Sequence, residues 1–272
     1  MVPNAPGARS NRPGDGTGTM SGPRSQLIMP ANRTDMLTKA PSYGADALVF
    51  DLEDSVPLDE KPKARALARE FIGKHKANST IYVRVNGART GMLEEDLEAV
   101  AVDGLAGIKL PKTESAEEIH RVDAMLAELE RERGLAHGSI GIGPTLESAK
   151  GVWFVYEIVS ASPRIQSVMP GTAQDADLQT DLGYASTTGN NEVLYYIRSR
   201  VLLAARAAGV AHVLDGVYAN IRDPEGLRIC CEAARRLGYR GKQVIHPNQI
   251  ETVNRIFTPT ARECAPIRDR AE

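Results

Sequence analysis

Eight short apolar runs alternate with eight amphipathic helical patterns in this 272-residue chain, and this alternation constrains its fold more than any other feature. The runs predict strands near 26–30, 47–51, 80–85, 106–110, 139–144, 166–170, 213–217 and 242–246. The patterns predict helices near 33–41, 59–75, 92–101, 115–133, 149–161, 190–208, 224–237 and 248–257. Strands that are separated by helices pair in parallel. Eight such units predict an α/β fold, a closed (β/α)8 TIM barrel with crossover helices.

Several predicted helices carry clear end signals. Asp223 is suited to cap the helix that Pro224 begins, and Gly238 can end that helix in the left-handed conformation. The 190–208 helix has a single apolar stripe, which is formed by Val193, Leu194, Ile197, Val201, Leu202 and Ala205.

The alternative to a barrel is an open, doubly wound sheet. Such sheets usually have a glycine-rich loop after the first strand, and the segment 29–32 (Met-Pro-Ala-Asn) contains no glycine. Gly141 and Gly143 lie mid-chain and lack the third glycine of a dinucleotide-binding loop. The sequence therefore favours the barrel.

Composition excludes several classes of function. The chain is 42% hydrophobic and 25% charged, which suits a globular protein with a substantial core. A net charge of −2 and only 5% aromatic residues give no basic or base-stacking surface for nucleic acid. No apolar run approaches the length of a membrane helix, so no membrane partner is expected.

The composition also suggests boundaries and a compartment. Residues 1–23 are rich in Gly, Pro, Ser and Asn and predict a disordered tail, followed by a barrel over 24–260 and a short C-terminal tail over 261–272. The three cysteines have no zinc-site spacing with histidine, so we interpret them as structural cysteines of a reduced, cytoplasmic protein.

Charged residues follow the apolar runs, at the strand ends where barrel enzymes carry their active sites. These residues are Asp51, Glu53, Asp54, Arg84, Lys112, Glu147, Asp175, Asp177, Asp215 and His246. These residues would lie together at the open end of the barrel, which we call its mouth. Carboxylates that lie so close together need a compensating cation, and Mg²⁺ accepts such oxygen ligands. Arginine binds a substrate carboxylate bidentately, so the pattern indicates metal-assisted chemistry on a small oxo acid.

Each of these residues alone also has a structural interpretation. Arg84 can serve as an ion-pair partner, and Asp51 can cap the helix that follows it. Lys112 can be an exposed residue before the next helix, and His246 can be a hydrogen-bonded barrel residue. The joint placement at one rim favours the functional interpretation.

Eight segments of the chain resemble a known family. They are RSQLIMPANRTDMLTKA from Arg24, FDLEDSV from Phe50, YVRVNG from Tyr82, LPKTES from Leu110, LESAKG from Leu146, DLQTDLGY from Asp177, LDGVYANIRDPEGL from Leu214 and GKQVIHPNQI from Gly241. Together they resemble the citrate lyase beta-subunit-like family of the HpcH/HpaI aldolase superfamily, which includes malyl-CoA and citramalyl-CoA lyases.

The resemblance implies an Mg²⁺-dependent carbon–carbon lyase that joins or releases a 2-oxo acid and an acyl thioester, on CoA or on an acyl carrier protein. It implies that Glu147 and Asp177 bind the metal, with Glu147 also lining the substrate. Arg84 is expected to bind substrate and stabilise the enolate, with Glu53 and Asp54 beside the metal and its waters. The resemblance also suggests a homotrimer or homohexamer.

Two departures from the family pattern open alternatives. The segment 171–177 is longer than the family's usual metal-binding turn, which makes Asp175 a rival to Asp177. The C-terminal segment that carries a catalytic Asp in many relatives has no equivalent before Glu272. A metal-dependent thioester hydrolase, and a non-catalytic barrel that serves in binding or assembly, therefore remain as alternative functions.

Overall fold

The computed structural model describes residues 22–184 and 192–260. The predicted tail over 1–23 lies outside the described residues apart from Gly22 and Pro23, and the predicted tail over 261–272 lies wholly outside them. The predicted domain boundaries therefore stay predictions. The barrel belongs to the compact unit Gly22–Thr258.

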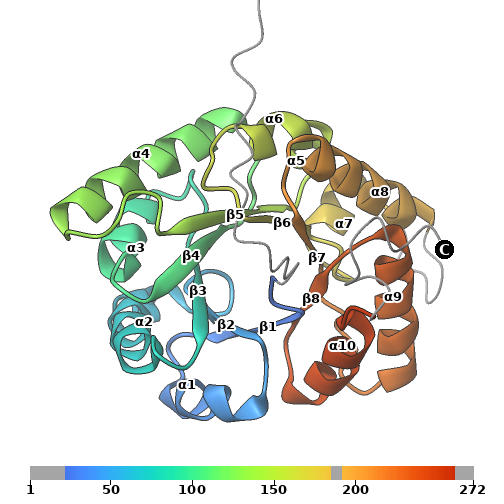
Figure 1. The fold of residues 1–272 in the computed structure, drawn as a ribbon, viewed down its shortest axis with the longest axis horizontal. Helices are drawn as coiled ribbons and strands as arrows, with labels where there is room; N and C mark the ends of the chain where they lie inside the picture. Colours follow the sequence, from blue (N-terminus) through green and yellow to red (C-terminus); the bar gives the residue numbers. More distant parts are fainter. Residues whose placement is uncertain (1–21, 185–191, 261–272) are drawn as a thin grey trace, which may run out of the picture. The chain divides into compact units, whose positions relative to one another are not determined.

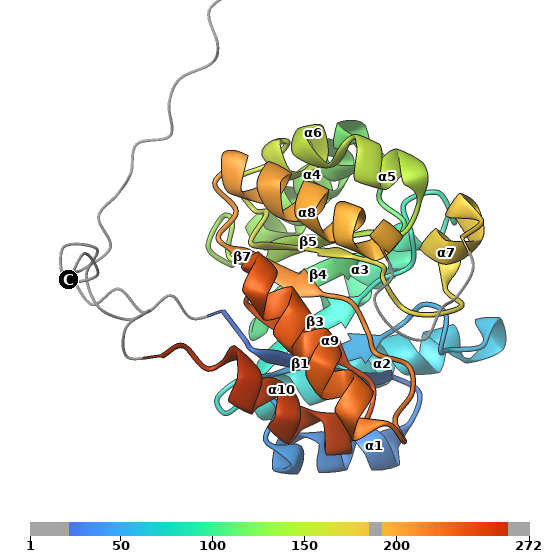
Figure 2. The ribbon, with the colours of Figure 1, turned by 90° about the vertical axis from the view of Figure 1, so that its right-hand side faces the viewer.

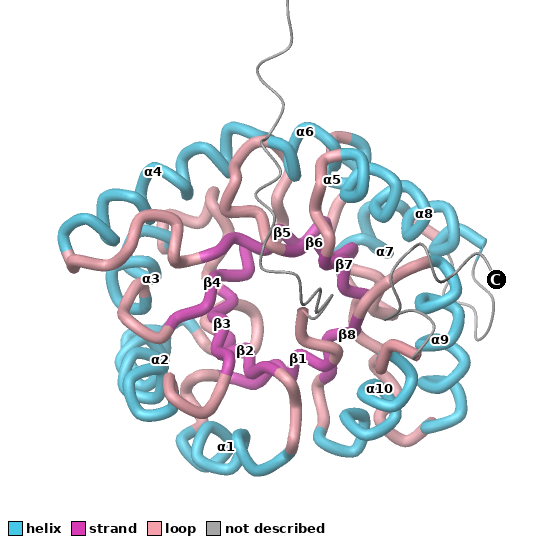
Figure 3. The backbone as a smooth tube through the Cα atoms, in the orientation of Figure 1, coloured by secondary structure: helices cyan, strands magenta, loops and turns pink. Residues whose placement is uncertain are grey.

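Eight parallel strands close into a barrel in sequence order, which confirms the predicted fold (Figure 1). The strands form a ring inside a layer of helices (Figure 3). They are β1 Ser25–Pro30, β2 Ala47–Asp51, β3 Thr80–Arg84, β4 Leu105–Leu110, β5 Gly141–Leu146, β6 Ser167–Pro170, β7 His212–Asp215 and β8 Gly241–Val244. Each lies within three residues of a predicted strand at both ends.

The helices follow the strands and cover the barrel, as Figure 2 shows for α8, α9 and α10. The α-helices are α1 Thr34–Lys39, α2 Lys61–His75, α3 Leu93–Val100, α4 Ala116–Glu132, α5 Ala149–Trp153, α6 Val155–Ser160, α7 Asp177–Leu182, α8 Glu192–Ala207, α9 Pro224–Leu237 and α10 Ile250–Phe257. Short 3-10 turns lie at Ala40–Tyr43, Leu58–Glu60 and Pro247–Gln249. In the described part of the chain, no helix has the length and apolar character needed to cross a membrane.

Two helices differ from the prediction. The single helix expected over 149–161 is divided at Phe154, whose ψ of 21° interrupts the helical backbone. The six-residue helix α7 was not predicted, because so short a segment shows no apolar periodicity. It begins at Asp177 and so positions one of the predicted metal ligands.

The end signals of α9 act as predicted. Asp223 accepts a hydrogen bond from the N–H of Gly226 at 2.8 Å, and Gly238 ends the helix with φ 110°. Cys231 of this helix is buried and, like Cys230, is a free cysteine, while Cys264 lies outside the described residues.

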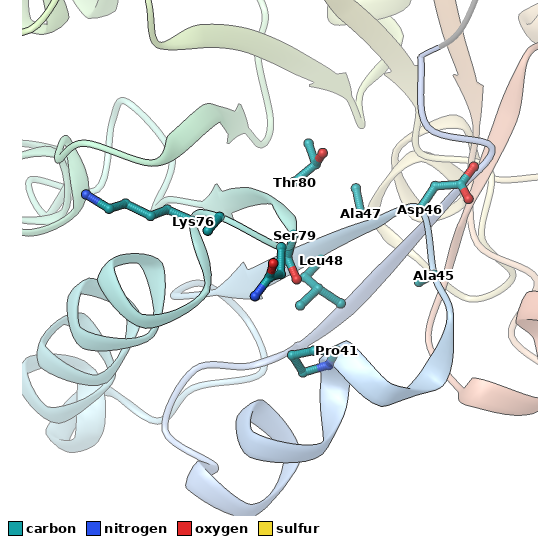
Figure 4. Close-up of a pocket in the computed structure, with 10 residues that line it drawn as sticks. Pro41, Ala45, Asp46, Ala47, Leu48, Lys76, Ser79 and Thr80 are labelled. Carbon is teal, nitrogen blue, oxygen red and sulfur yellow. The ribbon is translucent and has the colours of Figure 1, made fainter.

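The hydrophobic core lies between strands and helices. Phe50 of β2, Val83 of β3 and Leu97 of α3 are fully buried in it. Parallel pairing sets Asp51 beside Arg84, so the charged carboxyl ends of these strands meet at one edge. At the other end, a hollow of about 350 Å³ lies where β2 and β3 begin, beside Asp46 and Lys76 (Figure 4).

Candidate active site

An arginine–aspartate pair ties the ends of β2 and β3 together. Nε and Nη2 of Arg84 donate to the two carboxylate oxygens of Asp51, at 2.6 and 2.7 Å. Asp51 also accepts the N–H groups of Glu53 and Ser55, at 2.9 and 3.1 Å. Burial alone would raise the pKa of Asp51, but Arg84 lowers it below its usual range, so the carboxylate stays ionised. Asp51 therefore fixes the orientation of the guanidinium.

Glu53 lies next to this pair and is almost fully buried. Its Oε2 is 3.1 Å from Nη1 of Arg84, but the two do not have hydrogen-bond geometry, and this oxygen has no hydrogen-bond partner among the described residues. Burial raises the pKa of Glu53 above its usual value. A buried carboxylate oxygen without a hydrogen bond is costly unless a ligand completes it.

Lys112 connects the remaining carboxylates. Its Nζ lies 3.0 Å from Oε1 of Glu53, 3.4 Å from Oδ1 of Asp54 and 3.2 Å from Oδ2 of Asp177. Its backbone N–H donates to Oε2 of Glu147 at 3.0 Å. The residue has φ 52°, a left-handed conformation that is uncommon for a lysine. One residue therefore touches four carboxylates, which follow three different strands: β2, β5 and β6.

Glu147 directly follows β5. Desolvation of its carboxyl group and the charge of Glu53 raise its pKa to about 7, and Arg84 opposes this shift. A Cβ at Gly171 would lie 2.6 Å from Cγ of Glu147, so the glycine leaves the room that this side chain occupies. The carboxyl group thus sits in a crowded, partly desolvated place where a cation would favour its ionised form.

Three other predicted mouth residues lie outside this cluster. Asp215 is fully buried and pairs with Lys242 at 2.5 Å and with Arg198 at 2.8 Å, so it holds β7, β8 and α8 together. His246 is exposed, and its Nδ1 accepts the N–H of Asn248 at 3.2 Å.

The third is Asp175, which is exposed. Its backbone N–H donates to the side chain of Gln179, and among the described residues no ion pair or hydrogen bond joins its carboxylate to Lys112 or Arg84. Asp177 does contact the cluster, through Lys112. The geometry therefore favours Asp177 over its rival as a site residue.

Each residue of the predicted site contacts Arg84 or Lys112. Glu53 contacts both, whereas Asp54, Glu147 and Asp177 contact Lys112. The central place of Lys112 was missed in the sequence, although its position directly after β4, at the same level as the other strand-end charges, was the available signal.

The donor set suits a hard cation. The described residues contain no preformed group of three His, Cys, Asp or Glu side chains around one metal position. Glu147 and Asp177 nevertheless both supply carboxylate oxygens that contact Lys112, and Glu53 supplies an oxygen without a hydrogen bond. Oxygen donors of this kind fit Mg²⁺, which needs one or two protein carboxylates and takes its other ligands from water and substrate.

Comparison with known proteins shows which family this chain matches. Residues 24–247 match the model of the HpcH/HpaI aldolase/citrate lyase family. The chain is 37% identical over 242 residues to the citrate lyase subunit beta of Leuconostoc mesenteroides subsp. cremoris, covering 88% of this chain and 78% of that protein. It is 36% identical over 241 residues to a (3S)-malyl-CoA thioesterase of Cereibacter sphaeroides, with coverage of 88% and 79%.

A solved structure has the same fold. The citrate lyase beta subunit of M. tuberculosis, complexed with oxaloacetate and magnesium, superimposes with a TM-score of 0.72 and 30% sequence identity. The match covers 88% of this chain and 99% of that one.

Proposed function

The chain belongs to the HpcH/HpaI aldolase/citrate lyase family, and we propose that it is an Mg²⁺-dependent carbon–carbon lyase. The substrate would be a 3-hydroxyacyl thioester, on CoA or on an acyl carrier protein, that is cleaved to a 2-oxo acid and a shorter acyl thioester, or formed from them. The observation that carries this proposal is the cluster in which Arg84, itself held by Asp51, and Lys112 adjoin the carboxylates of Glu53, Glu147 and Asp177.

Glu147 and Asp177 would hold the magnesium ion. When bound, Mg²⁺ supplies positive charge against the negative charge that builds up on substrate oxygen. Support comes from the oxygen-only donor set and from the oxaloacetate and magnesium in the related citrate lyase beta subunit.

Arg84 would bind the acid and stabilise developing charge. Because Asp51 takes Nε and Nη2, the remaining Nη1 is the nitrogen available on the side of Glu53. A fixed guanidinium can donate to a substrate carboxylate or to the enolate oxygen without reorganising during the reaction.

Glu53 would move the proton. Cleavage removes the proton of the 3-hydroxyl group and leaves the bonding pair of the broken carbon–carbon bond on the thioester enolate, which then takes up a proton. The pKa of Glu53 lies above its usual value because the side chain is buried, and its Oε2 has no hydrogen-bond partner among the described residues. A carboxylate with a raised pKa is a stronger base than a solvated one, so it can accept the hydroxyl proton. Asp54, at the rim, would orient water near the cation.

Product analysis tests the proposal. The protein is incubated with Mg²⁺ and a panel of malyl-, citramalyl- and citryl-type CoA thioesters, and any 2-oxo acid is trapped as its phenylhydrazone. We expect 2-oxo acid and acyl-CoA in equal amounts, and their loss in an Arg84→Ala variant. Full turnover of that variant would contradict the proposed role of Arg84.

Thioester hydrolysis is the second candidate, favoured by the 36% identity to a (3S)-malyl-CoA thioesterase. Hydrolysis yields free CoA and an intact hydroxy acid, whereas lysis yields acyl-CoA and a 2-oxo acid. Binding of Mg²⁺ without either product would instead support the non-catalytic barrel.

A homotrimer or homohexamer in the cytoplasm is part of the same proposal, and sedimentation velocity of the full chain tests the number of subunits.

A further inference from the structure

A lysine ammonium occupies the point where three carboxylates of the mouth converge. Nζ of Lys112 lies within 3.4 Å of oxygens from Glu53, Asp54 and Asp177. Asp177 is also a proposed metal ligand. We propose that Lys112 is the resident counter-ion of the metal site, and that a divalent cation displaces its ammonium from Asp177. This inference rests on the proposed function only in taking Glu147 and Asp177 as metal ligands.

The side chain has a route out of the cluster. Lys112 is 40% exposed, and its partners Asp54 and Asp177 are 60% and 54% exposed. Pairs with this exposure are weak, because water screens the charges and two side chains must be held still. A divalent ion that two carboxylates bind directly can therefore outcompete the ammonium.

The rest of the residue is fixed while the ammonium moves. The backbone N–H of Lys112 donates to Glu147, and φ 52° holds the chain in the left-handed turn after β4. The movement would therefore be a change of side-chain rotamer around a Cα that stays in place. The N–H would continue to orient Glu147, so the same residue would position one metal ligand and release the other.

The other cation of the mouth has no such freedom. Arg84 is nearly buried and is held by two hydrogen bonds to Asp51. Two monovalent cations and a divalent ion within one small mouth repel each other, and the cost is least when the exposed lysine leaves. The geometry therefore selects Lys112, and not Arg84, as the group that exchanges.

Metal binding without turnover tests the exchange. Binding of Mn²⁺ to the full chain is measured by isothermal titration calorimetry and by electron paramagnetic resonance, for the wild type and for Lys112→Met, Lys112→Arg and Lys76→Met. Lys112→Met keeps the backbone N–H and removes the charge. Lys76→Met is the matched control, since Lys76 pairs with Asp103 at 2.6 Å, and its side chain lines the hollow beside the start of β3 (Figure 4).

The three variants should differ in their affinity for Mn²⁺. Removing a competing charge near a divalent ion should tighten Mn²⁺ binding in Lys112→Met by about tenfold. Lys112→Arg should bind no more tightly than the wild type, and Lys76→Met should match it. Equal or weaker binding by Lys112→Met, or no Mn²⁺ binding by any of the proteins, overturns the exchange.

The thioester assay separates the two proposals. If 2-oxo acid is released but Lys112→Met binds Mn²⁺ like the wild type, the exchange fails and the lyase function stands. If Lys112→Met binds more tightly and no thioester is cleaved, the exchange stands and the lyase function fails.

Discussion

Asp51 holds Arg84 through two parallel hydrogen bonds of 2.6 and 2.7 Å, between the ends of two adjacent strands. The carboxylate in turn accepts two backbone N–H groups of the loop after β2. The guanidinium is therefore oriented before any substrate arrives, with Nη1 on the side of Glu53. Such preorganisation avoids the cost of ordering a flexible arginine during the reaction.

Thioester cleavage should require the planar guanidinium of Arg84, and not only its positive charge. Arg84→Lys keeps one positive charge but cannot make the paired contact with Asp51 and a third contact to substrate at once. We expect kcat/KM for thioester cleavage to fall by roughly 100-fold to 1000-fold. Mn²⁺ affinity, measured in parallel, should change little, because Arg84 is not a proposed ligand. A lysine variant with wild-type kcat/KM would refute this role.

Substitutions of Asp177 and of Asp175 should differ in their effect on metal binding. Only Asp177 contacts the cluster, at 3.2 Å from Nζ of Lys112. Asp177→Asn should abolish the rise in Tm on adding Mn²⁺, a stabilisation of about 2.7 kcal/mol when metal exceeds Kd by 100-fold. Asp175→Asn, a matched change in the loop just before α7, should leave it intact. The reverse result would make Asp175 the ligand.

The barrel and its charged mouth could be predicted because both leave local patterns. Apolar runs mark the strands, and the residue after a run lies at the carboxyl end whatever the distant partners are. Register could not be predicted in this way. Arg84 faces Asp51 because β2 and β3 pair with these residues side by side, and nothing within either segment specifies that pairing.

The contacts of two residues could not be predicted for a related reason. Asp215 ends its strand like the mouth residues, but its side chain is enclosed by Arg198 and Lys242, which lie far from it in sequence. Lys112 is 40% exposed, as its place before the next helix suggested, but its left-handed backbone also brings both N–H and Nζ to the carboxylates. Side-chain direction at a strand end depends on neighbours and on local φ, which periodicity does not report.

The buried Lys242 should stabilise the fold. Burial alone would lower its pKa, but Asp215, 2.5 Å away, raises it, so both groups are charged in the folded protein. Lys242→Met leaves Asp215 with Arg198 as its remaining cationic partner among the described residues. We expect the free energy of unfolding to fall by about 3 kcal/mol in urea denaturation at pH 7. An unchanged midpoint would show that the pair contributes nothing net.

Lys109 is also buried, but unlike Lys242 it should destabilise the folded protein. Its Nζ lies inside the barrel, 3.1 Å from Oγ of Ser167 and 4.5 Å from the ring centre of Tyr82, and it forms no ion pair with any of the described residues. Burial lowers its pKa to about 7 from 10.5. Between these pH values the unfolded chain holds a proton that the folded chain lacks, so wild-type stability rises with pH across this window.

Lys109→Met removes this penalty. The variant should be more stable than the wild type at pH 7, and its advantage should shrink by up to about 1.4 kcal/mol for each pH unit toward 10. Urea denaturation at pH 7, 8 and 9 measures the difference. Lys63→Met, at an exposed site on α2, is the control and should show no such trend. An advantage that stays constant from pH 7 to 9 would mean that Lys109 remains charged in the folded barrel.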